Sequence, residues 1–461
     1  MNRAVARFDP ARLFAFAGTI GFALSTLAQS YPLQPSAGGS RSADILVFAI
    51  PFLQFVQLHV VGILYGSELL LLTVFLWCAC KGRLSLSTRN SKMFIVLCSL
   101  WFISQWVTDV VRHTEFVDFS RGWSRILMTI VSFSVLYTLL YGRPQRIVVY
   151  GWGLAAGGLI TFLVNPSEYD HVAPWKFGLS YPVAWAVFLL LSRQKCRGHW
   201  PITISVMLGL LNIYEGSRSL GGICLAVASY LWMISMWRRK HTGTVPMSAR
   251  FLLIVFLSIA LAGLGTAAMY RYAASSGLLG EFAQNAYEQQ STGDYGVLLG
   301  GRSAILGSIP AIYDSPILGH GSWARDPIYV LAQIEALYLA GYDDTSSVEN
   351  EELEEGYVPA HSYIFGAWVE AGILGAICWA WVLVLAVRAL LRVFPSRMVL
   401  HPLVAFCAIS LTWDSVFSPY GAQARIIVPY YLVMLMTYFG LAPRKVAPVA
   451  TELAHGASDV G

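Results

Sequence analysis

Three features of the sequence predict an all-α integral membrane protein. Of its 461 residues, 56% are hydrophobic and 12% are charged, whereas roughly a quarter of an ordinary soluble domain is charged. Apolar segments of about 17–25 residues, the length that a helix needs to cross a hydrocarbon core of roughly 30 Å, recur along the chain. Arginine and lysine gather in the short segments between them. The pattern excludes a water-soluble globule and predicts about twelve transmembrane helices.

The apolar segments, taken in chain order, give the predicted spans. The first follows Arg3, Arg7 and Arg12, and we interpret it as a retained helix. A cleaved signal peptide is the alternative, but no small-residue cleavage site precedes Tyr31. The predicted spans are Leu13–Gln29, Val60–Cys80, Phe94–Val111, Ile126–Leu140, Ile147–Leu163, Leu179–Leu191, Ile202–Ile213, Leu220–Met236, Phe251–Met269, His361–Leu391, Val399–Val416 and Ile426–Leu441.

Basic residues fix the predicted orientation. A further apolar stretch, Asp44–Leu58, would place the N-terminus outside if it crossed the membrane. Cytoplasmic loops carry an excess of arginine and lysine, and an inside N-terminus without this extra span puts 21 of the 31 basic residues in such loops. Residues 44–58 are therefore predicted to form a periplasmic or re-entrant helix. The 21 residues are Arg3, Arg7, Arg12, Lys81, Arg83, Arg89, Lys92, Arg143, Arg146, Arg193, Lys195, Arg197, Arg238, Arg239, Lys240, Arg250, Arg388, Arg392, Arg397, Arg444 and Lys445.

One long segment, residues 270–360, interrupts the alternation of predicted helices and short loops. Loops longer than about 12–15 residues are usually functional or disordered, so this one is expected to be partly helical and functional. Its acidic run, which begins at Asp343 and Asp344, is typical of a solvated segment. No histidine or third acid stands there at ligand spacing, so no metal site is predicted. The predicted parts are residues 1–269 with nine spans, 270–360 as a periplasmic loop subdomain, 361–442 with three spans, and 443–461 as a cytoplasmic tail.

Cysteine usage and net charge limit the expected partners. All seven cysteines fall in predicted helices or in a cytoplasmic loop, so no disulfide framework is predicted. The cytoplasmic loops account for the net charge of +5, and no nucleic-acid partner is expected. Membrane lipids are the expected surroundings of the apolar helices.

Polar residues gather at the predicted outer ends of the helices. Arg218 follows Glu215 in a turn with almost no loop between the seventh and eighth spans. There it either binds a ligand or extends toward lipid headgroups. Arg302 is expected to begin an amphipathic helix from Ser303 to about Tyr313. A basic residue opposes the helix dipole at that end, so either a bound anion or a salt bridge to one of the loop's acids is predicted.

The long loop re-enters the membrane at His361-Ser362-Tyr363. The start of a helix disfavours imidazolium, so a neutral His361 is a candidate general base; an interfacial histidine without chemistry is the alternative. Glu370 lies roughly 13 Å further along a continuous helix, so a structural hydrogen bond is favoured over catalysis there. Asp414, near the outer end of the eleventh span, is the acid better placed to orient His361.

Taken in order, these motifs resemble the O-antigen ligase and polymerase superfamily of membrane glycosyltransferases. The resemblance is most specific from Tyr214 to Gly375. His320, Arg325 and the acidic run have no assigned place in the family pattern. The motifs that carry it are Arg218 after a short outer turn, Gly301-Arg302, Asp314-Ser315-Pro316-Ile317-Leu318-Gly319-His320-Gly321, His361-Ser362-Tyr363, and Glu370-Ala371-Gly372-Ile373-Leu374-Gly375.

The resemblance implies a GT-C-like enzyme that transfers an oligosaccharide from polyprenyl pyrophosphate without a metal or cofactor. The family's two essential arginines correspond to Arg218 and Arg302, and its histidine corresponds to His361. One guanidinium group donates two hydrogen bonds at once to phosphate oxygens. Two such groups can neutralise a leaving pyrophosphate in place of a metal. The other candidate residues, expected to bind substrate, are Glu215, Tyr363, Glu370 and Asp414.

The acceptor stays open at the level of sequence. Polymerisation of O-antigen or exopolysaccharide repeat units at the periplasmic face of the bacterial inner membrane is the favoured interpretation. Ligation of O-antigen to the sugar core of lipid A is the alternative with the same chemistry. A lipid-linked oligosaccharide flippase or another transporter is the alternative of a different class. It would place basic residues in a deep central cavity, and the chain lacks the inverted repeats of many transporters.

Overall fold

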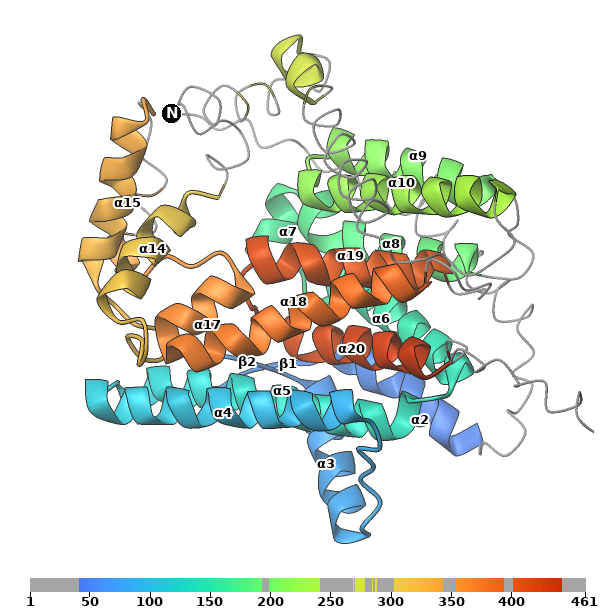
Figure 1. The fold of residues 1–461 in the computed structure, drawn as a ribbon, viewed down its shortest axis with the longest axis horizontal. Helices are drawn as coiled ribbons and strands as arrows, with labels where there is room; N and C mark the ends of the chain where they lie inside the picture. Colours follow the sequence, from blue (N-terminus) through green and yellow to red (C-terminus); the bar gives the residue numbers. More distant parts are fainter. Residues whose placement is uncertain are drawn as a thin grey trace, which may run out of the picture. The chain divides into compact units, whose positions relative to one another are not determined.

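The structure is a computed structural model of the chain, and it describes residues 41–192, 199–240, 268, 270–277, 284, 287, 302–342, 348, 353–393 and 401–441 (Figure 1). The chain divides into two compact units, Met1–Leu46 and Val47–Gly461. The first unit contributes only the start of helix α2 (Arg41–Phe52) to the described residues. The predicted span Leu13–Gln29, all of Phe251–Met269 except Ala268, and the tail 443–461 lie outside them.

The segment between α2 and α3 (Gly66–Cys80) departs from the prediction. The helix predicted over residues 44–58 ends at Phe52, and a 3-10 turn, η1 (Leu53–Phe55), leads into a hairpin. Strands β1 (Gln57–His59) and β2 (Ile63–Tyr65) pair antiparallel, with Leu58 opposite Leu64. The predicted span Val60–Cys80 is therefore wrong at its start, because the backbone of Ile63–Tyr65 is used for strand pairing.

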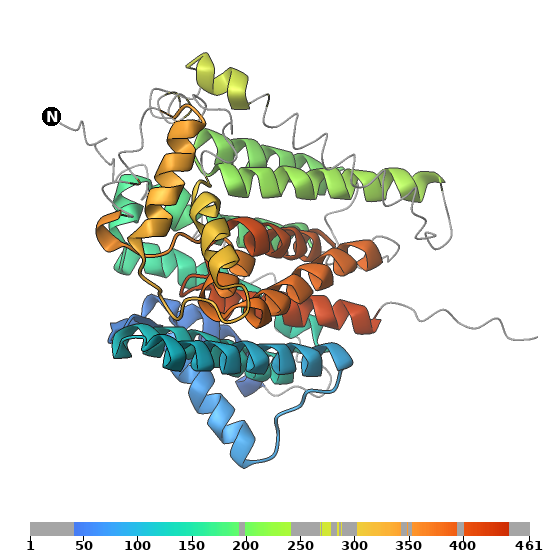
Figure 2. The same ribbon diagram turned by 60° about the vertical axis from the view of Figure 1, so that its left-hand side comes forward.

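Six long helices between Arg89 and Lys240 coincide with predicted spans. α9 and α10 pack along each other as an antiparallel pair in both views (Figures 1 and 2). Two short elements, α7 (Glu168–Val172) and η2 (Pro174–Leu179), separate the third and fourth of the six. The six are α4 (Arg89–Arg112), α5 (Phe116–Leu140), α6 (Pro144–Val164), α8 (Ser180–Leu191), α9 (Trp200–Tyr214) and α10 (Arg218–Lys240).

The predicted span His361–Leu391 is two helices, α17 (Tyr363–Ala371) and α18 (Ile373–Val393). Gly372 separates them with a φ of 68°, a left-handed conformation that glycine adopts without steric cost. A side chain at this position would also collide with the backbone of Ile317. The prediction of one continuous helix is therefore wrong, because the break depends on a contact with a segment far away in the sequence.

Helices α19 (His401–Phe417) and α20 (Ala424–Leu441) complete the described fold and coincide with the last two predicted spans. A group of aromatic rings joins them to α4 and the α17–α18 pair. Tyr420 lies in ring contact with Trp101, Tyr363 and Trp379, and Trp101 and Trp379 are almost fully buried. These rings form a buried core beside Tyr363, at the start of α17.

The described part of the outer loop contains the predicted amphipathic helix. This is α14 (Ala304–Asp314), and α15 (Pro327–Leu339) packs against it, followed by the short α16 (Leu353–Glu355). Both views place α14 beside α17 (Figures 1 and 2). The helices meet through a buried apolar cluster of Ala311, Tyr329, Val358 and Val369.

Five helices of the described residues are long and apolar enough to cross a membrane, judged by length and composition. They are Arg89–Arg112, Phe116–Leu140, Pro144–Val164, Arg218–Trp237 and Ile373–Leu391. The remaining apolar helices are shorter. The five long apolar helices make the chain an all-α membrane protein. A total of about twelve spans and the periplasmic position of the loop stay predictions.

Candidate functional site

Arg302 lies at the start of α14, as the sequence predicts. Its Nη2 donates a hydrogen bond to Ser219 Oγ on α10 at 2.8 Å, and its guanidinium carbon lies 5.8 Å from the centre of the Trp413 ring on α19. Among the described ion pairs, none includes Arg302. Three elements thus hold the side chain in place without a direct ion pair among the described residues.

Arg218 is placed by the tight turn between α9 and α10. The Ser217 amide donates to the Asn212 carbonyl at 2.7 Å, and Gly216 in the turn has a φ of 80°. Arg218 begins α10, where its Nη1 donates to Tyr270 Oη at 3.2 Å. The turn therefore brings Arg218 to the same end of α10 as Ser219, which contacts Arg302.

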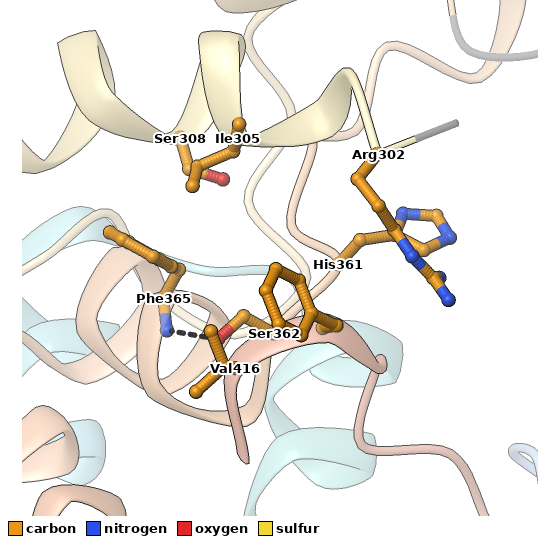
Figure 3. Close-up of a pocket in the computed structure, with 8 residues that line it drawn as sticks. Arg302, Ile305, Ser308, His361, Ser362, Phe365 and Val416 are labelled. Carbon is orange, nitrogen blue, oxygen red and sulfur yellow. Dashed lines mark hydrogen bonds between the residues drawn. The ribbon is translucent and has the colours of Figure 1, made fainter. Parts of the chain in front are cut away.

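His361 lines a pocket together with Arg302 (Figure 3). His361 precedes Ser362, whose side chain caps α17 by accepting a hydrogen bond from the Phe365 amide at 3.3 Å and donates one to the Ser415 carbonyl at 2.9 Å. These bonds tie the entry of α17 to the end of α19. The pocket is lined by Arg302, Ile305, Ser308, His361, Ser362, Phe365, Val416 and Phe417.

The electrostatic environment of His361 keeps its imidazole neutral. Desolvation lowers the pKa of His361, and the positive charge of Arg302 lowers it further. The sequence pointed to the start of the helix as the reason. In the structure Ser362 occupies the capping position, and desolvation with Arg302 accounts for the shift. The result is a neutral, proton-accepting ring beside a cation.

Asp414 lies near Arg302. Its Oδ1 accepts a hydrogen bond from Ser418 at 2.8 Å, and its carboxylate interacts electrostatically with Arg302. The described hydrogen bonds do not join Asp414 to His361, so the expected orienting pair is absent from this arrangement of the described residues. Asp414 therefore acts on the candidate site through its electrostatic interaction with Arg302.

Lys176 is a cation of this site that sequence reasoning missed. It lies on η2, and desolvation followed by the positive charges of Arg218 and Arg302 lowers its pKa. One feature of the sequence indicates that Lys176 is unusual. Lysine in a short loop on the predicted outer side runs against the usual excess of basic residues inside. We refer to Lys176, Arg218, Arg302 and His361 as the cation site.

Two predicted substrate-binding residues lie away from the pocket. Glu215 is exposed at the end of α9. Tyr363 is buried, and its ring packs 4.7 Å from the Trp379 ring and 5.0 Å from the Tyr420 ring, centre to centre. Neither is among the residues that line the pocket. Tyr363 therefore contributes to the core that supports His361.

Glu370 lies at the far end of α17 in an ion pair with Arg125 of α5. Its backbone carbonyl accepts a hydrogen bond from the Gly321 amide at 3.0 Å, and the neighbouring Val369 carbonyl accepts one from the His320 amide at 2.7 Å. This placement agrees with the expectation of a structural bond. Glu370 holds the segment after α14 against α17.

The whole motif from Asp314 to Ser322 is fixed in the same way. The Arg112 guanidinium donates to Ser315 and to the Gly319 carbonyl. Asp109 accepts from the amide and the hydroxyl of Ser322, at 2.6 and 2.7 Å. We refer to residues 314–322, with Asp109, Arg112, Arg125 and Glu370, as the loop anchor.

The two residues left unassigned by the family pattern find roles next to this anchor. The His320 ring Nε2 lies 2.7 Å from the Ala311 carbonyl, close to the end of α14. Arg325 pairs with Asp118 at 3.3 Å and donates to the Tyr357 hydroxyl at 3.1 Å. His320 thus connects two parts of the outer loop, and Arg325 connects the loop to α5 and to Tyr357.

Within the described ranges, no group of three or more histidine, cysteine, aspartate or glutamate side chains is arranged to hold a metal ion. Asp343 and Asp344 fall outside those ranges. The chemistry available at the cation site is therefore that of guanidinium, ammonium and a neutral imidazole. Such a set binds an anion and removes a proton next to it.

The fold and this site define a multi-pass helical membrane protein with a cationic pocket at one end of its helices. Residues 203–380 match the family model described as O-antigen ligase, a match that covers less than half of the chain. This domain is similar to O-antigen ligase, a family of glycosyltransferase-like enzymes, and the resemblance read from the short motifs is confirmed. Neither a curated protein nor a solved structure matches the chain.

Proposed function

We propose that this protein transfers an oligosaccharide from polyprenyl pyrophosphate to the hydroxyl group of a glycan acceptor, at the periplasmic face of the inner membrane. The observation that carries the proposal is the placement of Arg302 beside His361 (Figure 3) in a domain of the O-antigen ligase family. A cation that binds the leaving phosphate and a neutral base that activates the attacking hydroxyl are the two requirements of this reaction.

The proposed step begins with proton transfer from the acceptor hydroxyl to His361. The acceptor oxygen forms a bond to the anomeric carbon of the donor sugar. The bond between that carbon and the phosphate oxygen breaks, and the oxygen of polyprenyl pyrophosphate keeps the electron pair. Arg302 and Arg218 stabilise the charge on the leaving group with paired hydrogen bonds.

Asp414 supports Arg302 in this proposal. Its negative charge acts on Arg302, so it helps to keep the guanidinium charged and oriented at the end of α19. The earlier pairing with His361 is replaced by this role. Glu370 and Tyr363 support the scaffold, and Glu215 is free to contact a substrate at the exposed turn.

Because the matched family model is described as O-antigen ligase and that family acts on lipid A core acceptors, we adopt the sugar core of lipid A as the acceptor in this proposal. Polymerisation uses the same site and differs in the acceptor, which is then the end of another lipid-linked chain. A flippase would place its cations in a deep cavity, whereas Arg218, Arg302 and His361 lie at or just before the starts of α10, α14 and α17.

The test uses purified protein with a defined polyprenyl-pyrophosphate oligosaccharide, with and without lipid A core. We expect glycosylated lipid A core in the complete mixture and none with His361→Ala. Lengthened lipid-linked chains without lipid A core would identify a polymerase. Absence of both products in a protein that binds the donor would contradict glycosyl transfer.

A further inference from the structure

Lys176 is the one member of the cation site to which the proposed mechanism gives no role. It lies on η2, the irregular turn before α8, and its ammonium group lies 4.6 Å from the centre of the Phe177 ring. A lysine that only extended toward lipid headgroups would need no fixed turn. The local contacts of η2 show that its position is fixed.

Asn212, in the last turn of α9, connects Lys176 to Arg218. The Asn212 side-chain oxygen accepts a hydrogen bond from the Trp175 ring at 3.1 Å, and its backbone carbonyl accepts one from the Ser217 amide at 2.7 Å. Trp175 directly precedes Lys176, and Ser217 directly precedes Arg218. A single buried asparagine thus fixes the residues next to both cations.

The charges around Lys176 are of its own sign. Arg218 and Arg302 both act on Lys176 and disfavour its charged form. None of the ion pairs in the described residues includes Lys176. Like charges held close together repel each other, and an anion that binds among them removes this repulsion. Three side chains from three separate elements therefore form a place for a multiply charged anion.

We propose that Lys176 is a third phosphate-binding cation, which offsets the negative charge that the leaving pyrophosphate gains as the sugar–phosphate bond breaks. The inference rests on the proposed function and extends it. In the donor, both phosphates are diesters with one charge each. After the bond breaks, the released phosphate is terminal and carries roughly −1.5 to −2 charge at pH 7.

Lys176 is therefore expected to interact more strongly with the transition state and product than with the donor. An interaction of this kind raises kcat, whereas one that is equal in donor and transition state lowers only KM. A hydrogen bond to a charged group contributes enough to change a rate or an affinity by about tenfold to a hundredfold.

The experiment compares Lys176→Met, Lys176→Arg and the control Lys92→Met in the full-length protein. Lys92 is exposed near the start of α4 and lies in a predicted cytoplasmic loop. We expect Lys176→Met to lower kcat by about tenfold or more with KM changed less than threefold, and Lys176→Arg to recover most of kcat. Lys92→Met should behave as the unchanged protein.

Inhibition by two soluble probes separates charge recognition from a structural effect. Farnesyl pyrophosphate carries the terminal diphosphate of the product, and farnesyl phosphate carries one phosphate. Lys176→Met should weaken inhibition by the diphosphate about tenfold and by the monophosphate less. A normal kcat with unchanged diphosphate inhibition would overturn the role of Lys176. If Arg302→Ala and His361→Ala are also fully active, the proposed function itself fails.

Discussion

The cation site and the loop anchor contain similar residues but differ in charge balance. In the anchor, Arg125 meets Glu370, and Arg112 donates to carbonyl and hydroxyl oxygens. In the cation site, Arg302 and Lys176 have no ion pair among the described residues. Arg302 and His361 of the site and Glu370 of the anchor all belong to the stretch that the family motifs mark, so the motifs alone do not separate the two regions.

The difference shows how to distinguish a binding residue from a supporting one. Buried charges persist where they are paired or where a ligand completes them. In the anchor, Arg125 of α5 is paired with Glu370, and Arg112 of α4 holds the outer loop through carbonyl and hydroxyl oxygens. Arg302 of the cation site is held by a neutral hydrogen-bond partner, Ser219, and it forms no direct ion pair among the described residues.

The largest expected effect compares a histidine from each region. His361→Ala should lower turnover by about 10²–10⁴-fold, because a positioned base contributes that much, while the melting temperature stays unchanged. His320→Ala removes a contact to the Ala311 carbonyl and should lower the melting temperature with turnover per folded molecule nearly intact. Rates in the transfer assay and thermal melting in detergent measure both. Equal loss of turnover in the two variants would contradict the division between the regions.

The next effect concerns the ion pair of the anchor. Arg125→Ala leaves Glu370 buried without its partner, and breaking a buried pair costs about 3–5 kcal/mol. We expect a lower melting temperature and less folded protein. The double variant Arg125→Met with Glu370→Gln removes both charges and should be more stable than Arg125→Ala. If the double variant is the less stable of the two, Glu370 is not held by this pair.

Substitution within the cation site should act on chemistry. Arg302→Lys keeps the charge but loses the paired donors that match phosphate oxygens, so we expect a loss of about 10²-fold in kcat/KM, comparable to the removal of one transition-state donor. Melting should not change. Full activity of Arg302→Lys would remove the claim of a paired interaction, and Arg112→Lys provides the matched comparison in the anchor.

The smallest effect is a shift in pH dependence. Desolvation and Arg302 lower the pKa of His361, and the base acts in its neutral form. Activity is therefore lost as the pH falls through a value below the ordinary histidine pKa of about 6.5. The logarithm of kcat measured against pH should show this acidic limb. A limb above pH 7, or one unchanged in His361→Ala, would show that another group is the base.

Much of the fold follows from contiguous sequence. Runs of apolar residues specify α4, α6 and α10 within a few residues, because the length of a run and the cost of exposing the backbone in lipid are local properties. The end of α5 is predicted in the same way, but α5 begins at Phe116, well before the predicted Ile126. The start of α14 just after Arg302 and the order of the family motifs are likewise readable from the sequence. The predicted transfer chemistry rests on that order.

Tertiary structure decided what depends on contacts between distant segments. Gly372 breaks the predicted helix because its backbone lies against Ile317, and Gly319 approaches the same break. Asp414 lies near Arg302, and Asn212 bonds to Trp175 and Ser217, the residues that precede Lys176 and Arg218. Sequence periodicity fixes which residues share a face of one helix, but the packing of helices against each other decides which faces meet. That packing pairs Arg125 of the anchor with Glu370 and leaves Arg302 of the site without a direct ion pair among the described residues.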